Sequence, residues 1–128
     1  MNVYLDRARR PQCPARLTLA DGDTIGASNR VYYALFDAVR AVLSARKLAD
    51  LERIRTHHGT SHVFTMSVVE AGLLDNEVAL IFRKALELRS DADYGSDTDL
   101  DREAVEAAVQ QAATFIDACA KLVEGSAP

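Results

Sequence analysis

The sequence predicts an all-α fold, an up-and-down antiparallel bundle of four to five helices. Four stretches repeat apolar residues at intervals of three and four, the period of an amphipathic helix. No stretch alternates β-branched and polar residues over the length of a strand, and the chain has only six glycines and three prolines. The connections between these stretches are short, which favours antiparallel neighbours.

The first helical region is predicted to be broken. Residues 4–10 and 15–20 both have helical character, but Pro11 and Pro14 lie between them. Each proline lacks a backbone N–H and crowds the preceding turn, so one continuous helix is excluded. We expect a kinked first helix, with Pro14 in the first turn of its second half.

The next region, residues 28–47, is predicted to be the central helix, in contact with all the others. Its apolar residues occupy nearly every side, as expected for a helix surrounded by neighbours. They are Val31, Tyr32, Ala34, Leu35, Phe36, Ala38, Val39, Val42 and Leu43.

Two helices follow. A short one is expected over residues 59–71, carrying Val63, Phe64, Met66 and Val69. A longer one runs from Asp75, a candidate N-cap after Gly72, to about Asp93, and Gly95 ends it. Its inner face is predicted to contain Val78, Ile81, Phe82, Ala85 and Leu88.

The last helix has the clearest pattern. Thr98 with Asp101 supplies a capping-box start, and Gly125 a stop. The apolar face is predicted to contain Val105, Ala108, Val109, Ala112, Phe115, Ile116, Cys119 and Leu122.

Length and composition indicate one globular domain, residues 1–128, with 48% hydrophobic and 27% charged residues. The net charge of −4 argues against general attraction to DNA or an anionic membrane. Residues 1–60 nevertheless hold ten basic and six acidic side chains, and residues 61–128 hold five and thirteen. Any contact with RNA is therefore expected to be local, unless this asymmetry only reflects solvated helix faces.

The expected location is the cytoplasm. No run of about 18 apolar residues is present, and the first ten residues have charges where a signal peptide would be apolar. Cys13 and Cys119 are too few for a disulfide framework and have no metal-binding spacing, so both are interpreted as reduced thiols, Cys119 in the core. No cofactor is predicted.

Polar residues that a bundle does not require are the candidates for a binding site. Arg30, Tyr33 and Asp37 share one face of the central helix. There an arginine could hold a phosphate through two hydrogen bonds, with the tyrosine hydroxyl as a second donor. In the alternative interpretation, Arg30 pairs with a carboxylate across the bundle and Tyr33 is an ordinary core residue.

A second polar group, Thr56, His57, His58 and Gly59, directly precedes the short helix. His58 and His62 have the spacing of a helical metal chelate, but no third ligand lies at a recognisable distance, so no metal is predicted. A histidine here would ordinarily cap the helix or lie on the surface, although a neutral imidazole near arginine also suits general base catalysis.

A third group closes the helix at residues 75–93. Arg89 and Asp93 are four residues apart and could form a weak intrahelical ion pair. Tyr94, beside Gly95, could be an aromatic anchor at the helix end.

Taken together, N-R-V-Y-Y-A at 29–34, T-H-H-G at 56–59 and R-S-D-A-D-Y at 89–94 resemble the HEPN domain family of bacteria and archaea. The resemblance covers about residues 15–123, including the order and spacing of all three motifs, and points to the small single-domain members of the toxin–antitoxin type. It implies a helical bundle that forms homodimers and pairs with a nucleotidyltransferase antitoxin. It also implies that active members are metal-independent endoribonucleases.

The catalytic motif implied by the resemblance is an arginine followed, after four to six residues, by a histidine. Histidine would move the proton of the RNA 2′-hydroxyl, and arginine would stabilise charge on the phosphate. Counted from Arg89, the histidine positions hold Tyr94, Gly95 and Ser96, and none of these can replace imidazole. His57 could supply the imidazole from another helix, so the predicted catalytic pair is Arg89 and His57.

Three functions are consistent with this sequence. The first is a HEPN protein of a toxin–antitoxin or defence module that lacks the full ribonuclease motif and binds nucleotide, RNA or a nucleotidyltransferase. The second is an active endoribonuclease toxin, and the third a dimeric helical adaptor without a polar site. The ligand-binding residues predicted for the first function are Asn29, Arg30, Tyr33, Asp37, His57, Asp93 and Tyr94.

Overall fold

The computed structural model describes residues 3–9, 24–48, 56–94 and 102–125. All the regular elements in these ranges are helical, as the sequence predicts: α1 (Val3–Arg9), α3 (Thr24–Ala45), α4 (His57–Phe64), the π-helical segment η1 (Thr65–Val69), α5 (Asn76–Tyr94) and α6 (Arg102–Glu124). The kink predicted around Pro11 and Pro14 and the cap at Thr98 lie outside the described residues. None of the described helices combines the length and apolar content needed to cross a membrane.

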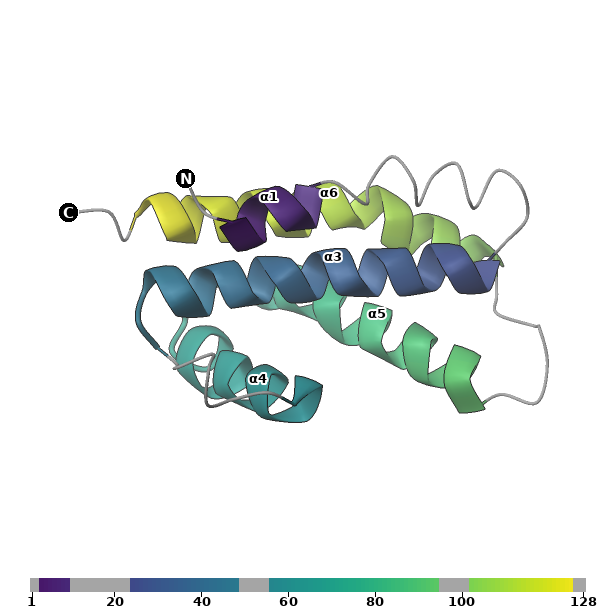
Figure 1. Ribbon diagram of the computed structural model, residues 1–128, viewed down its shortest axis with the longest axis horizontal. Helices are drawn as coiled ribbons and strands as arrows, with labels where there is room; N and C mark the ends of the chain where they lie inside the picture. Colours follow the sequence, from purple (N-terminus) through teal and green to yellow (C-terminus); the bar gives the residue numbers. More distant parts are fainter. Residues whose placement is uncertain (1–2, 10–23, 49–55, 95–101, 126–128) are drawn as a thin grey trace.

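Helix α3 is the centre of the bundle and contacts α1, α4, α5 and α6. Helices α1 and α5 run antiparallel to α3, whereas α6 runs in the same direction as α3 because α5 intervenes in the chain (Figure 1). Helix α3 begins at Thr24, four residues before the predicted start at Ser28. The pattern missed this first turn because Gly26 is a poor helix former and Ile25, although apolar, lies on the exposed side of the helix.

Helix α5 begins as predicted. The Asp75 Oδ1 atom accepts a hydrogen bond from the Glu77 backbone N–H at 3.1 Å, which satisfies one of the free N–H groups of the first turn. Helix α6 ends at Glu124, directly before Gly125, and its predicted apolar face is buried except for the partly exposed Leu122. The Nε of Arg46 donates to the Leu122 carbonyl at 3.2 Å, joining the end of α3 to the last turn of α6.

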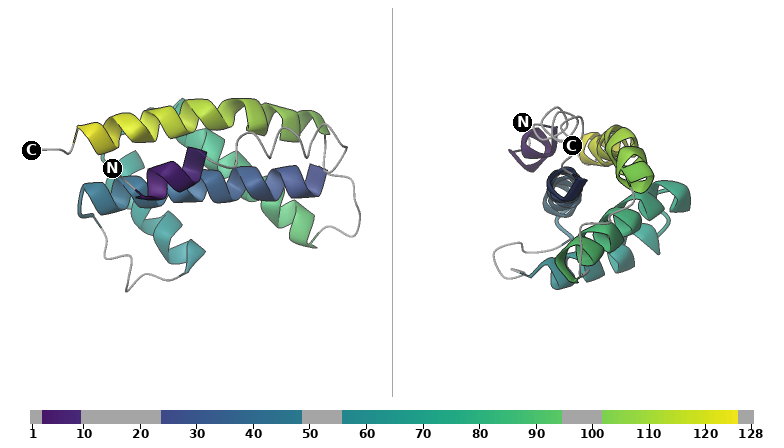
Figure 2. Two further views of the ribbon diagram at one scale, coloured as in Figure 1. Left: turned by 45° about the horizontal axis from the view of Figure 1, so that its top comes forward. Right: turned by 90° about the vertical axis from the view of Figure 1, so that its right-hand side faces the viewer.

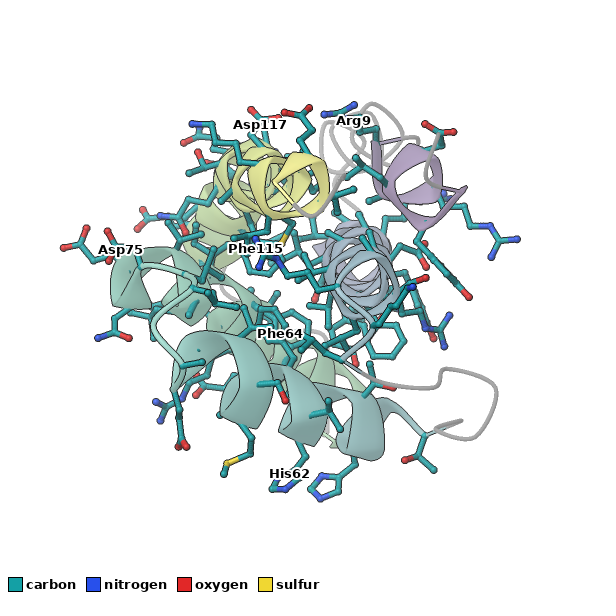
Figure 3. The ribbon with its side chains drawn as sticks, turned by 90° about the vertical axis from the view of Figure 1, so that its left-hand side faces the viewer. Arg9, His62, Phe64, Asp75, Phe115 and Asp117 are labelled. Carbon is teal, nitrogen blue, oxygen red and sulfur yellow. The ribbon has the colours of Figure 1, made fainter. Side chains whose placement is uncertain are left out.

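Aromatic rings from four helices meet in the core. The centroid of the Phe82 ring of α5 lies close to the centroids of three other rings. The distances are 6.2 Å to Tyr32 of α3, 5.7 Å to Phe64 of α4 and 5.8 Å to Phe115 of α6. Phe64 and Phe115 both point into the space between the helices, whereas His62 points away from it (Figure 3). The cluster therefore holds α4 and α5 against the pair formed by α3 and α6.

The short helix differs from the prediction. It begins at His57 rather than Gly59, and its last five residues, from Thr65 onward, form a π-helix in which the Glu70 N–H donates to the Thr65 carbonyl at 2.9 Å. Val68 is fully buried within this segment, and Met66 is 51% exposed. Gly72, at φ 77°, then turns the chain into α5, in a left-handed conformation that favours glycine.

Candidate binding site on helix α3

One side of α3 is left open by the described helices. Helices α1 and α6 lie against one part of its surface and α4 and α5 against another (Figure 2). The residues facing the opening lie within about 100° of one another around the helix and form a band along it, which we call the α3 stripe. It consists of Asn29, Arg30, Tyr33, Asp37 and Arg40.

Tyr33 is the aromatic residue of the α3 stripe. Its side chain is 46% exposed, although the fully buried Tyr32 next to it contributes to the core. The two rings meet edge to face with their centroids 5.6 Å apart. Tyr33 is therefore not an ordinary core residue, because nearly half of its surface faces solvent.

Arg40 belongs to the α3 stripe but to none of the motifs in the sequence. Its guanidinium carbon lies 4.4 Å from the centroid of the Phe36 ring, within the range of a cation–π contact. A guanidinium Nη1 of Arg40 also lies 3.9 Å from Asp37 Oδ1. The signal that could have identified it is its spacing, three residues after Asp37 and seven after Tyr33.

Asp37 is the acidic residue of the α3 stripe and is partly buried. Burial raises the pKa of its carboxyl group above the usual value, and the positive charges of Arg40 and of Arg7 on α1 counteract part of that rise. The carboxylate is therefore held among cations, and the site combines one partly buried acid with arginines from two helices.

The side chains of four predicted site residues, His57, Arg89, Asp93 and Tyr94, lie outside the described part of the structure. Their backbone positions are described: His57 is the first residue of α4, and the other three lie in the final turns of α5. The last turn of α5 and the first turn of α3 lie at the same end of the bundle (Figure 1). Convergence of these side chains with the α3 stripe, and the catalytic pair of Arg89 and His57, stay predictions.

The other two histidines are both exposed on α4. Contrary to the sequence analysis, His58 lies within the first turn of the helix and not before it. Among the described residues, no three His, Cys, Asp or Glu side chains come together in a way that could hold a metal ion.

Comparison with known proteins identifies the family of this bundle. A HEPN domain model matches residues 1–122. The chain belongs to the HEPN family. It is 33% identical to a UPF0332 protein of Thermotoga maritima over 118 residues, which cover 92% of this chain and 86% of the relative. It is also 30% identical over 95 residues to a protein of Methanocaldococcus jannaschii named as a "putative toxin", covering 74% of this chain and 67% of that protein.

The end of α5 is the region where the resemblance to HEPN proteins predicts an arginine and a histidine. The segment contains Arg89, but the three positions where the motif histidine is expected hold tyrosine, glycine and serine. The first of them, Tyr94, is the last residue of α5. The chain thus has the HEPN fold, and its α3 stripe has a partly exposed aromatic ring beside arginines.

Proposed function

We propose that this HEPN protein binds single-stranded RNA along the α3 stripe and acts in a toxin–antitoxin or defence module. The observation that carries the proposal is the half-exposed ring of Tyr33, with Arg30 exposed one turn before it and Arg40 two turns after it. Aromatic rings that stack on bases, combined with arginines that track the phosphates, are the usual means of binding single strands.

The spacing of the α3 stripe supports this ligand. Arg30 and Arg40 are ten residues apart, which corresponds to about 15 Å along a helix, the length of about two nucleotides of an extended strand. Helix α1 adds the exposed Arg7, whose charge acts on Asp37 of this surface. Local positive charge of this kind compensates for the overall charge of −4.

Fluorescence anisotropy with a labelled twelve-nucleotide oligouridylate tests the proposal. We expect Tyr33→Ala to weaken binding about tenfold through lost stacking, and Tyr33→Phe to keep most of the affinity. Arg30→Ala and Arg40→Ala should weaken binding and reduce its salt dependence. Arg102→Ala, which removes an exposed arginine of α6, serves as the control. Equal affinity of Tyr33→Ala and the wild type would refute the proposal.

The same samples distinguish binding from cleavage. We expect the labelled RNA to remain intact, because a histidine is missing from the motif positions that follow Arg89. Cleavage that disappears in both His57→Ala and Arg89→Ala would instead favour the active endoribonuclease.

The toxin role is supported by the name of the M. jannaschii relative. We expect induced expression to slow bacterial growth, and the double variant Arg30→Ala/Tyr33→Ala to relieve that effect at equal protein level. Unimpeded growth with the wild type would contradict the toxin role without affecting the RNA-binding result.

A further inference from the structure

A groove separates α5 from α4 and η1 and includes no residue of the α3 stripe. Its volume is about 490 Å³, within the range of about 300 to 1,000 Å³ that is typical of sites for small molecules. The residues that α5 contributes recur at intervals of three and four, because they lie on the face of the helix that turns toward α4. They are Asn76, Ala79, Leu80, Phe82, Arg83 and Leu86.

The inside of the groove is apolar. Phe64 and Phe82, only 1% and 6% exposed, are its most deeply buried lining residues, and the partly buried Val69 and Leu86 also line it. Ala79 leaves space between them because its side chain is a single methyl group. A closed cavity of about 150 Å³ holds benzene, so this larger but open groove has room for a body of about eight to ten carbon atoms.

The edge of the groove is polar and positively charged. Among the described residues that line it, Arg83 is the one with a charge. Its Nε atom lies 3.6 Å from Glu87 Oε1, but both side chains are more than half exposed, so this surface pair is weak and leaves the guanidinium able to bind another anion. The exposed Asn76, the first residue of α5, adds an amide N–H donor. The groove is therefore complementary in charge to an anion.

We propose that the groove binds a small amphipathic carboxylate of the medium-chain fatty acid type, with its apolar chain against Phe64 and Phe82 and its carboxylate on Arg83. The planar fork of guanidinium donors matches a carboxylate in shape, and one arginine matches its single charge. A phosphate monoester carries nearly two negative charges at neutral pH and is a poorer match to one cation. The wall opposite α5 includes the π-helical segment η1, and π-turns frequently occur at functional sites. The proposal does not depend on RNA binding.

Isothermal titration calorimetry with octanoate, below the concentration at which it forms micelles, tests the proposal. We expect the wild type to bind one octanoate per chain and Arg83→Gln to weaken binding about tenfold, because the charged hydrogen bonds are lost. Octanol has the same chain without the charge, so it should bind the wild type about tenfold more weakly than octanoate does. Arg83→Gln should bind octanol as the wild type does. Octyl phosphate should bind no more tightly than octanoate.

Matched variants separate the charge of the groove from its space. Lys84→Gln removes the neighbouring exposed cation of α5, which does not line this groove, and should leave octanoate binding unchanged. Ala79→Leu fills part of the groove and should weaken octanoate and octanol alike, whereas Ala107→Leu, at an exposed position of α6, should affect neither. Circular dichroism checks that each variant is folded.

Four results would each overturn the proposal. They are no octanoate binding by the wild type, equal affinity of Arg83→Gln and the wild type for octanoate, weaker binding by Lys84→Gln, and unchanged binding by folded Ala79→Leu.

Discussion

The ionised carboxylate of Asp37 lowers the stability of the fold, although it lies beside positive charges. Its partial burial makes the ionised form costly, and Arg40 and Arg7 compensate for only part of that cost, so its pKa is raised. A carboxyl group with a raised pKa binds its proton more tightly in the folded protein than in the unfolded chain. Its contribution to stability therefore falls as the pH rises from the ordinary value of 3.8 through the folded pKa.

We predict that Asp37→Asn raises the free energy of unfolding at neutral pH, because the amide has no charge to desolvate. The advantage over the wild type should shrink as the pH is lowered toward 4, where the wild-type carboxyl group becomes protonated. Urea denaturation of both proteins between pH 4 and 7 measures this difference. If the difference in stability did not change with pH, the effect of the substitution would not come from the charge of the Asp37 carboxylate.

The candidate site was partly predictable at the level of residues. The spacing of Arg30, Tyr33 and Asp37 was sufficient to place them on one face of a helix, and the structure has all three on the α3 stripe. Their exposure could not be predicted, because Tyr33 and the buried Tyr32 are identical in type and adjacent in sequence. Which of the two faces solvent depends on where α1 and α5 pack against the helix.

Helix α4 is an element whose start depends on one hydroxyl group. The Thr56 Oγ1 accepts a hydrogen bond from the Gly59 backbone N–H at 3.0 Å and so satisfies a donor of the first turn. From the sequence alone, Thr56 belongs to a polar group with the histidines, and the helix is predicted to start three residues later, at Gly59. The same residue type serves both in caps and in binding sites, so its role was clear only from the backbone geometry.

We predict that Thr56→Ala lowers the free energy of unfolding by about 1 kcal/mol, the usual effect of losing a helix cap. Thr56→Ser keeps the hydroxyl group and should stay close to the wild type. Denaturation by urea, monitored by circular dichroism, compares the three proteins. If alanine and serine had equal effects, the capping hydrogen bond would not contribute to stability.

The bundle as a whole is held together by contacts that periodicity does not specify. The pattern correctly predicted that Phe82 and Phe115 face inward. It could not predict that their rings stack with centroids 5.8 Å apart, because that contact depends on the relative position of α5 and α6. Sequence patterns give the buried face of each helix, and the packing of the helices decides which buried residues touch.

We predict that Phe115→Ala lowers the free energy of unfolding by about 3 to 5 kcal/mol. The substitution leaves a cavity in the core and removes the ring contacts with Phe64 of α4 and Phe82 of α5. Phe115→Leu retains most of the volume and should cost much less. Thr114→Ala, at the exposed neighbouring position, should change stability by less than about 0.5 kcal/mol. Urea midpoints measure all three. A small effect of the alanine variant would mean that the aromatic cluster is not a main source of stability.

The π-helical segment after α4 has a consequence for comparing members of this family. A π-turn closes its hydrogen bond over five residues instead of four, as between Thr65 and Glu70, and so contains one residue more than a regular turn. Removal of a single residue between Thr65 and Val69 would convert the segment to an ordinary helix and leave the neighbouring helices in place. Relatives are therefore expected to tolerate a gap of one position here, and pairwise alignments should allow it inside the helix as well as in loops.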